Sequence, residues 1–342
     1  MLGGAGAALA GAALPLPTHG AGPAPPSLIK PPRLRRGDLV ALVASGGLMS
    51  DAEIERAVAN IESLGLRVKT GANIRLKRGN YAGTPAQQVD DLHAAFRDRE
   101  VRAVWGGRGG SGCSMLLPLL DYGLIRRHPK VLVGFSDVTA LHLAIHRHAG
   151  LVTFHGPAGI STFSGYSVAH LEAVLMEAQP AFTIRRAPEN ASRAQADPLF
   201  RERVFRAGVA TGPLMGGNLA VLCALVGTPY AAQLKGTIAF FEDVGEAPYR
   251  VSRMFTQLVQ SGELPAAAGV MLGVFRKCEP PPGEASLTLE EALEDNLWPI
   301  QAPSAYGYSF GHIAQHFTIP LGVRARLDTA AGTLTLLEPA VA

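Results

Sequence analysis

One stretch constrains the fold of this chain more than any other, because it passes from a strand to a helix with almost nothing between them. Residues 131–133 form an apolar Val-Leu-Val run typical of a buried strand, and a helical pattern of apolar residues is established by Leu141. Only the turn Gly134–Asp137 separates the two. Such a turn lies at the carboxyl edge of a parallel sheet and leaves the first backbone N–H groups of the helix unpaired.

Ser136 lies in this turn, and the stretch leaves two interpretations of it open. In a nucleophile elbow, a sharp strand-to-helix turn exposes a serine hydroxyl, although the usual G-x-S-x-G spelling is absent here. Alternatively, Ser136 or Asp137 caps the helix, as Ser and Asp commonly do. The stretch taken alone favours capping, because short motifs often arise by chance.

Strands and helices alternate through the first half of the chain. Strands are expected at 39–43 and 101–105, which are largely apolar, and at the short stretch Arg67-Val68-Lys69. Amphipathic helical patterns occur between them at 51–64 and 84–96. This alternation predicts an α/β fold built on a doubly wound parallel sheet.

The 342 residues are enough for two domains. We expect an N-terminal α/β domain over 34–170 that carries Ser136, a linker or crossover over 171–206, and a C-terminal domain over 207–342. The linker is predicted because residues 187–198 show no periodicity. Within the second domain we expect strands at 237–241 and 269–274, a helix at 250–261 and a closing hairpin at 325–337.

Residues 1–33 are expected to form a signal-like or disordered segment. Residues 1–17 are uncharged and rich in Gly, Ala and Leu, and small residues follow, as in a secretory signal. The charged start of such a signal is missing, and the run is too short and too glycine-rich to span a membrane. We therefore expect a cytoplasmic protein with no membrane span, or a periplasmic one if the segment is a truncated export signal.

Composition and motif spelling argue against several classes of function. The net charge is only +3 and the basic residues are scattered, so no nucleic-acid partner is expected. Cys113, Cys223 and Cys278 lie far apart, which predicts neither a disulfide framework nor a zinc site. The glycine loop Gly106–Gly112 lacks both the dinucleotide and the P-loop spelling, so we expect no cofactor. Its N–H groups suit an anion or an oxyanion, or the loop is a plain tight turn.

His142 and His146 are four residues apart and share a helix face, which is the spacing of a metal-binding pair. No glutamate accompanies them as in H-E-x-x-H, and no third ligand is apparent. We therefore expect partly exposed histidines and no metal site.

Two further polar residues follow or end predicted strands. Glu242 comes directly after the strand 237–241, where a carboxylate can orient another group, cap a turn or pair with a nearby arginine. His312 lies next to small residues that leave its ring accessible. Singly, each is more often structural, but with Ser136 they supply a hydroxyl, an imidazole base and a carboxylate that holds the imidazole.

Several short motifs are spread in order from about Gly37 to Leu337. They are Arg108–Gly112, Leu116–Pro118, Leu120–Tyr122, Gly134–Leu141, Phe154–Pro157, Gly216–Leu219, Gly227–Pro229, Phe241–Asp243, Pro248–Arg250, Gly311–His312 and Pro320–Gly322. Together they resemble the LD-carboxypeptidase family of serine peptidases over nearly the whole chain.

The resemblance implies a triad in which Ser136 is the nucleophile, His312 the base and Glu242 the residue that orients the base. It also implies an N-terminal Rossmann-like domain, a smaller C-terminal β-rich domain, a site in the cleft between them and a homodimer. The typical family activity removes the terminal D-alanine from murein tetrapeptides during cell-wall recycling, which makes a murein-derived peptide the expected partner. The alternatives are a hydrolase of microcin C-type peptide–nucleotide antibiotics and a non-catalytic murein-peptide-binding protein.

On this interpretation the oxyanion is held by the N–H of Asp137 and a second donor from Gly109 or Gly110. Arg108, or a helix N-terminus, is expected to bind the free carboxylate of the substrate.

Three positions depart from the family pattern, and none belongs to the triad. Ser111 replaces a usual Tyr, Met115 replaces a common Arg, and Ser252 replaces an Asp. Because the first two are expected to border the cleft, they bear on substrate choice more than on chemistry.

Overall fold

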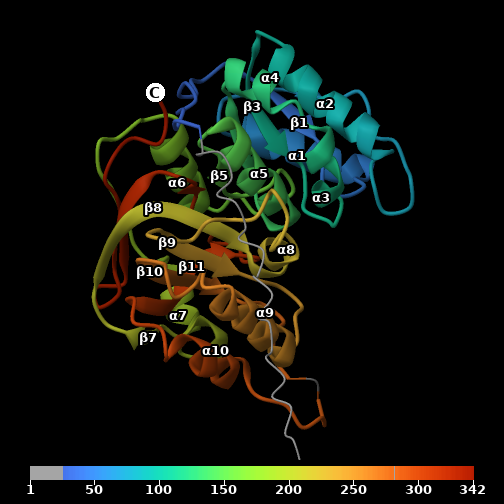
Figure 1. Ribbon diagram of the computed structural model, residues 1–342. Helices are drawn as coiled ribbons and strands as arrows, with labels where there is room; N and C mark the ends of the chain where they lie inside the picture. Colours follow the sequence, from blue (N-terminus) through green and yellow to red (C-terminus); the bar gives the residue numbers. More distant parts are fainter. Residues whose placement is uncertain (1–25, 281) are drawn as a thin grey trace, which may run out of the picture.

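The computed structural model describes residues 26–280 and 282–342 (Figure 1). Residues 1–25, which make up most of the predicted signal-like segment, lie outside the described residues. None of the helices in the described part of the chain combines the length and the apolar character needed to cross a membrane.

The first domain is built on a six-stranded sheet with the order β12-β5-β4-β3-β1-β2. Its strands are β1 (Leu39–Val43), β2 (Arg67–Thr70), β3 (Val101–Gly106), β4 (Val131–Gly134), β5 (Phe154–His155) and β12 (Ile319–Pro320). All neighbours pair in parallel except β12, which is antiparallel to β5. The predicted doubly wound parallel sheet is confirmed. Every residue of β4 is buried, as expected for a parallel strand covered on both faces.

The helices of this domain are α1 (Asp51–Glu62), α2 (Pro85–Arg97), α3 (Cys113–Leu116), α4 (Tyr122–Arg127), α5 (Thr139–Ala149) and α6 (Gly165–Leu175). The first two begin at capping boxes. Ser50 accepts a hydrogen bond from the N–H of Glu53, and Thr84 accepts one from the N–H of Gln87. These caps fix where each helix starts.

The second domain is built on an eight-stranded sheet with the order β6-β14-β13-β8-β9-β10-β11-β7. Its strands are β6 (Phe182–Ile184), β7 (Arg203–Arg206), β8 (Val209–Asn218), β9 (Ile238–Glu242), β10 (Gly269–Val274), β11 (Ser304–Gly311), β13 (Arg324–Asp328) and β14 (Thr333–Leu336). The four strands from β8 to β11 are parallel, and the outer strands are antiparallel. The helices are α7 (Pro188–Arg193), α8 (Leu219–Ala224), α9 (Pro248–Gln260) and α10 (Leu289–Leu297).

The segment 171–206 is not the irregular linker that the sequence predicts. It places β6 at one edge of the second sheet and β7 at the other, with α7 between them. The expectation was wrong because edge strands of three or four residues are too short to show a clear alternation of polar and apolar positions.

The two domains are joined by more than one chain crossing. After β11 the chain returns to the first domain as β12, where Ile319 and Pro320 pair with His155 and Phe154. The end of β8 lies against the start of α5, because the N–H of Asn218 donates to Thr139 Oγ1 at 3.0 Å. These contacts hold the carboxyl ends of β4, β9 and β11 close together.

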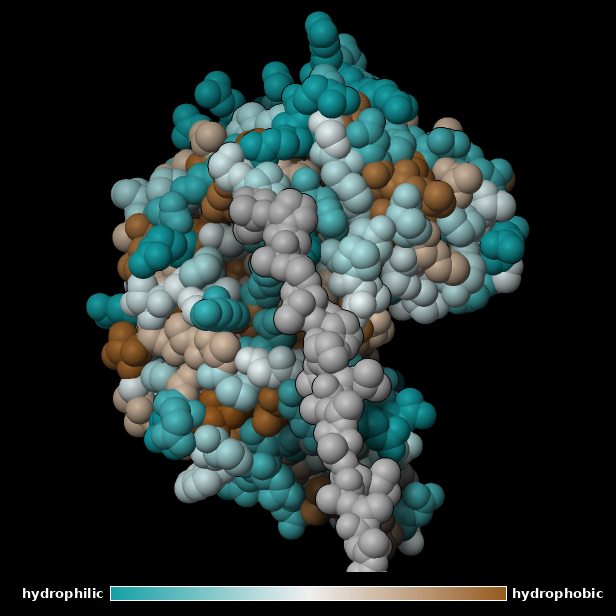
Figure 2. Space-filling model, in the orientation of Figure 1, coloured by the Kyte–Doolittle hydropathy of each residue, from teal (hydrophilic) through white to brown (hydrophobic). Residues whose placement is uncertain are grey.

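The surface offers no single dominant apolar area on the face drawn in Figure 2. There, hydrophobic side chains form small separate patches among polar ones.

Candidate active site

Ser136 occupies a strained turn between β4 and α5. Its φ is 61°, a left-handed conformation that residues other than glycine rarely adopt. The turn passes through a short 3-10 segment at Ser136–Val138 before α5 begins, and neither segment has a side-chain cap. Ser136 is therefore not a helix cap, and the elbow interpretation describes its geometry. Backbone strain of this kind costs about 1–3 kcal/mol and is typical of functional sites.

The structure brings the three candidate catalytic side chains into direct contact. The Nε2 atom of His312 lies 3.0 Å from the Oγ of Ser136, and its Nδ1 lies 2.7 Å from the Oε2 of Glu242. Glu242 ends β9 and His312 directly follows β11, and β10 lies between these two parallel strands. Both strands end at the same edge of the second sheet, where they meet the elbow of the first domain. The result is a hydroxyl–imidazole–carboxylate chain assembled from both domains.

Two opposing influences act on the imidazole of His312. Burial lowers its pKa, but the charge of Glu242 and the hydrogen bond to it outweigh burial, so the pKa is raised above its ordinary value. A carboxylate placed in this way stabilises the imidazolium that forms when the ring takes a proton. The ring of Phe135 packs against the imidazole, with 4.8 Å between the ring centroids, and helps to fix its orientation.

Glu242 itself is fully buried, and it is held by residues that the sequence did not single out. Asn218, at the end of β8, donates from Nδ2 to Glu242 Oε1 at 3.4 Å and to Asp243 Oδ1 at 2.9 Å. Burial and the neighbouring Glu242 charge raise the pKa of Asp243 to about 6. The signal that could have pointed to Asn218 is a polar residue at the end of a parallel strand adjacent to β9.

Gly109 lies against the nucleophile. A Cβ atom at Gly109 would be 2.7 Å from the Cβ of Ser136 and 2.8 Å from its Oγ, so only glycine permits this approach. Among the described residues, no protein acceptor receives the backbone N–H of Gly109, Gly110 or Asp137. Gly109 and Gly110 also line the cleft over Ser136.

The glycine loop is anchored on the turn that follows β1. The carbonyl of Gly46 accepts hydrogen bonds from the N–H groups of Ser111 and Gly112, each at 3.0 Å. Asp137 Oδ2 accepts the N–H of Cys113 at 2.9 Å, which ties the elbow to the end of the same loop. The loop and the nucleophile are therefore held in one fixed arrangement.

A cleft of about 500 Å³ opens over Ser136 and His312 and is lined from both domains. Its lining includes the basic residues Arg56, Arg108, Arg276 and Lys277. Arg108, the predicted carboxylate ligand, forms an ion pair with Glu53 at 3.0 Å and donates to the carbonyl of Leu48 at 3.2 Å. Its charge is therefore already compensated within the protein.

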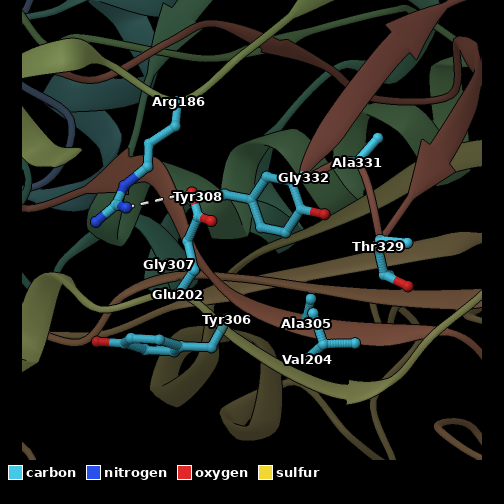
Figure 3. A pocket seen from close by; sticks show the side chains of 11 residues that line it. Arg186, Glu202, Val204, Ala305, Tyr306, Gly307, Tyr308, Thr329, Ala331 and Gly332 are labelled. Carbon is cyan, nitrogen blue, oxygen red and sulfur yellow. Dashed lines mark ion pairs between the residues drawn. The ribbon is translucent and has the colours of Figure 1, made fainter.

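A second, smaller hollow lies at the β7 and β11 edge of the second sheet (Figure 3). Arg186 and Glu202 form an ion pair there at 3.2 Å, and Tyr306 and Tyr308 also line it. None of the side chains that line it is a serine, cysteine or histidine. The nucleophile and base therefore belong to the larger cleft.

The histidine pair on α5 meets the expectation at only one of its two members, because His146 is half-buried and His142 is not. His142 is fully buried, and its Nε2 lies 2.9 Å from the carbonyl oxygen of Gly134. The expectation of partial exposure was wrong for His142, because α5 packs against both α4 and the second domain. Within the described ranges, no group of three His, Cys, Asp or Glu residues is placed to hold a metal ion.

Comparison with known proteins identifies the chain. Residues 40–156 match the LD-carboxypeptidase N-terminal domain, and residues 211–327 match the LD-carboxypeptidase C-terminal domain. This protein belongs to the LD-carboxypeptidase family. It is accordingly a hydrolase, and the predicted family is confirmed.

Relatives in this family support the assignment over most of the chain. The protein is 36% identical over 312 residues to a probable murein peptide carboxypeptidase of Bacillus subtilis, covering 90% of this chain and 94% of the relative. It is 32% identical over 295 residues to the murein tetrapeptide carboxypeptidase of Pseudomonas aeruginosa, covering 84% and 92% respectively.

Solved structures show the same fold. A muramoyltetrapeptide carboxypeptidase from Oxalobacter formigenes matches with a TM-score of 0.74 at 28% identity, covering 87% of this chain and 97% of that one. The microcin C7 self-immunity protein MccF in complex with glutamyl sulfamoyl guanosine matches with a TM-score of 0.82 at 23% identity, covering 92% and 99%. At that identity, the second match supports the fold alone.

Proposed function

We propose that this protein is a serine LD-carboxypeptidase that releases the terminal D-alanine from murein-derived peptides. The proposal rests on one observation: the chain of contacts from Ser136 Oγ to His312 Nε2 at 3.0 Å and from His312 Nδ1 to Glu242 Oε2 at 2.7 Å. The names of the relatives support the substrate class, because they are murein peptide carboxypeptidases.

In the proposed reaction, His312 Nε2 accepts the hydroxyl proton of Ser136 while Oγ attacks the carbonyl carbon of the L,D-peptide bond. The negative oxygen that results is held by the N–H of Asp137 together with that of Gly109 or Gly110. His312 then gives the proton to the nitrogen of the departing D-alanine as the C–N bond breaks. Water, deprotonated by the same imidazole, hydrolyses the acyl-enzyme and restores the serine.

The test is release of D-alanine from a murein tetrapeptide by the purified protein. Wild-type protein is expected to release it, and Ser136→Ala is expected to reduce the rate by at least ~10⁴-fold. Labelling with a serine-reactive phosphonate separates this proposal from a non-catalytic peptide-binding role, because only an activated serine reacts. Wild-type protein that neither labels nor cleaves any L,D-peptide contradicts the proposal.

The peptide–nucleotide alternative finds less support in the cleft. An aromatic platform for a nucleobase would favour it, but Trp105 is fully buried in β3 and Trp298 follows α10, outside the cleft lining. We infer that murein peptides are the better substrates. Parallel assays with a tetrapeptide and with an aminoacyl sulfamoyl adenosine decide between them.

We further infer that the protein works as a cytoplasmic homodimer, as expected from the family resemblance and from a role in recycling murein peptides. Light scattering at working concentrations tests the dimer. N-terminal sequencing of the mature protein tests the compartment, since removal of an N-terminal segment would indicate export.

A further inference from the structure

Four basic residues line the cleft, and only one of them has its charge compensated within the described protein. Arg56 and Arg108 come from the first domain, and Arg276 and Lys277 come from the second. Arg108 is paired with Glu53, whereas Arg56, Arg276 and Lys277 are exposed and form no ion pair with any described residue. No carboxylate belongs to the cleft lining, so an anionic substrate group would find uncompensated cations there.

The proposed reaction determines on which side of Ser136 the C-terminal carboxylate of the substrate lies. His312 must reach the departing nitrogen, so the departing residue sits on the imidazole side of Ser136. Its carboxylate carbon is only two bonds away, about 2.5 Å from that nitrogen. A residue that binds this carboxylate must therefore stand beside His312.

Arg276 and Lys277 stand in this position. They follow β10, the parallel neighbour of the strand that leads into His312. Arg276 Nη1 donates to the backbone carbonyl of His312 at 3.3 Å, so the guanidinium is adjacent to the catalytic imidazole. Arg56 approaches from α1, on the opposite wall of the cleft.

The backbone at Lys277 adds an independent observation. Its φ is 55°, again in the left-handed region, where glycine would be unstrained. The turn is held by the loop after Glu242: the N–H of Arg276 donates to Asp243 O at 3.0 Å, and the N–H of Gly245 donates to Arg276 O at 2.9 Å. A strained residue fixed so firmly at a cleft points to a use for its side chain.

We propose that Arg276 and Lys277 bind the C-terminal carboxylate of the departing D-residue and thereby make the enzyme an exopeptidase. This inference rests on the proposed carboxypeptidase function and replaces Arg108 as the carboxylate ligand. Arg276 offers a planar pair of donors, and Lys277 adds a second, mobile positive charge. A peptide that ends in an amide, or continues beyond this residue, leaves both cations without a partner.

The experiment compares two tetrapeptides that differ only in a C-terminal carboxylate or carboxamide. For wild-type protein, kcat/KM is expected to be ~10²-fold higher for the acid, because hydrogen bonds to charged groups discriminate by this amount. Arg276→Met and Lys277→Met are each expected to lower kcat/KM for the acid ~10-fold or more and to leave kcat/KM for the amide nearly unchanged. The ratio of the two kcat/KM values, acid over amide, therefore falls.

Lys277→Met could lose activity because it misfolds, so Lys277→Gly serves as a second variant. Glycine adopts the left-handed backbone conformation without strain. This variant is expected to stay folded and to lose the preference for the acid. Lys235→Met, an exposed lysine in the turn before β9 and outside the cleft lining, is the matched control and is expected to keep the full ratio.

The outcomes separate the two proposals. Equal cleavage of acid and amide by wild-type protein would show that no carboxylate is recognised, while the hydrolase function would stand. The assignment to Arg276 and Lys277 would be overturned if Lys277→Gly and Arg276→Met kept the wild-type ratio of kcat/KM for the acid to kcat/KM for the amide. It would also be overturned if Arg56→Met lost this preference instead. Failure of wild-type protein to cleave either peptide would reject the proposed function and this inference with it.

Discussion

Replacing Glu242 with glutamine measures what one buried charge contributes to the proposed mechanism. Glu242 is fully buried, and its Oε2 accepts a hydrogen bond from His312 Nδ1 at 2.7 Å. Glutamine keeps the volume, but its neutral amide can donate to Nδ1 and so shift the imidazole proton to Nε2. There it faces Ser136, and the ring can no longer accept the serine proton. A wrong tautomer of this kind lowers kcat ~10⁴-fold, which corresponds to a loss of about 5 kcal/mol of transition-state stabilisation.

The same substitution changes the pH dependence in a defined direction. In the wild type, burial lowers the pKa of His312 and Glu242 outweighs this, so the pKa lies above its ordinary value of 6.5. The base must be neutral, so kcat/KM falls as the pH drops through this raised pKa. Without the Glu242 charge, burial becomes the main influence and lowers the pKa of His312, and the smaller opposing effects of Asp243, which raises it, and Arg276, which lowers it, remain. The acidic limb of the profile therefore moves to lower pH.

The assay follows kcat/KM for D-alanine release from about pH 5 to 9 in both proteins. Glu246→Gln is the control, because Glu246 lies in the loop after β9 and pairs with Arg250 rather than with the imidazole. This control is expected to keep both the rate and the profile. Undiminished kcat/KM in Glu242→Gln, or an acidic limb that does not move, would refute the role assigned to this carboxylate.

Three further substitutions test the geometry around the nucleophile. Gly109→Ala places a methyl group 2.7 Å from the Cβ of Ser136 and should lower kcat ~10²-fold, whereas Gly165→Ala, which meets open space, should leave D-alanine release unchanged. Ser136→Gly removes the strain of a φ of 61° and should raise stability by about 1 kcal/mol in calorimetry, although the variant is inactive; Ser136→Ala should show no such gain. Asp137→Ala leaves the N–H of Cys113 without its buried acceptor and should cost about 1–3 kcal/mol in urea unfolding, much of which Asp137→Asn should recover.

The parts of the fold that could be predicted are those determined by local pattern. Apolar runs at residues 39–43 and 131–133 lie within buried parallel strands of the first sheet, and the Ser50 and Thr84 caps begin helices near the expected positions. Glu242 ends one parallel strand of the second sheet and His312 follows another, so both lie at one edge of that sheet. Their meeting with Ser136, which follows β4 of the first sheet, was implied only by the resemblance to the family.

The remaining features depend on tertiary contacts that local pattern does not encode. The strand at 182–184 is too short to be recognised and exists only because it pairs with β14. His142 is buried because the second domain packs against its helix. Arg108 is occupied by Glu53, which precedes it by 55 residues, so its availability to a substrate could not be judged from the loop that carries it.

The short strand β12 has a consequence for any attempt to divide or recombine this enzyme. It comes from the far end of the polypeptide yet completes the border of the sheet that presents the serine. A fragment that stops before Ile319 would leave β5 with bare hydrogen-bonding groups, which invites association with other chains. A chimera that exchanges specificity between relatives must therefore take the six-stranded sheet of the first domain and β12 from the same parent.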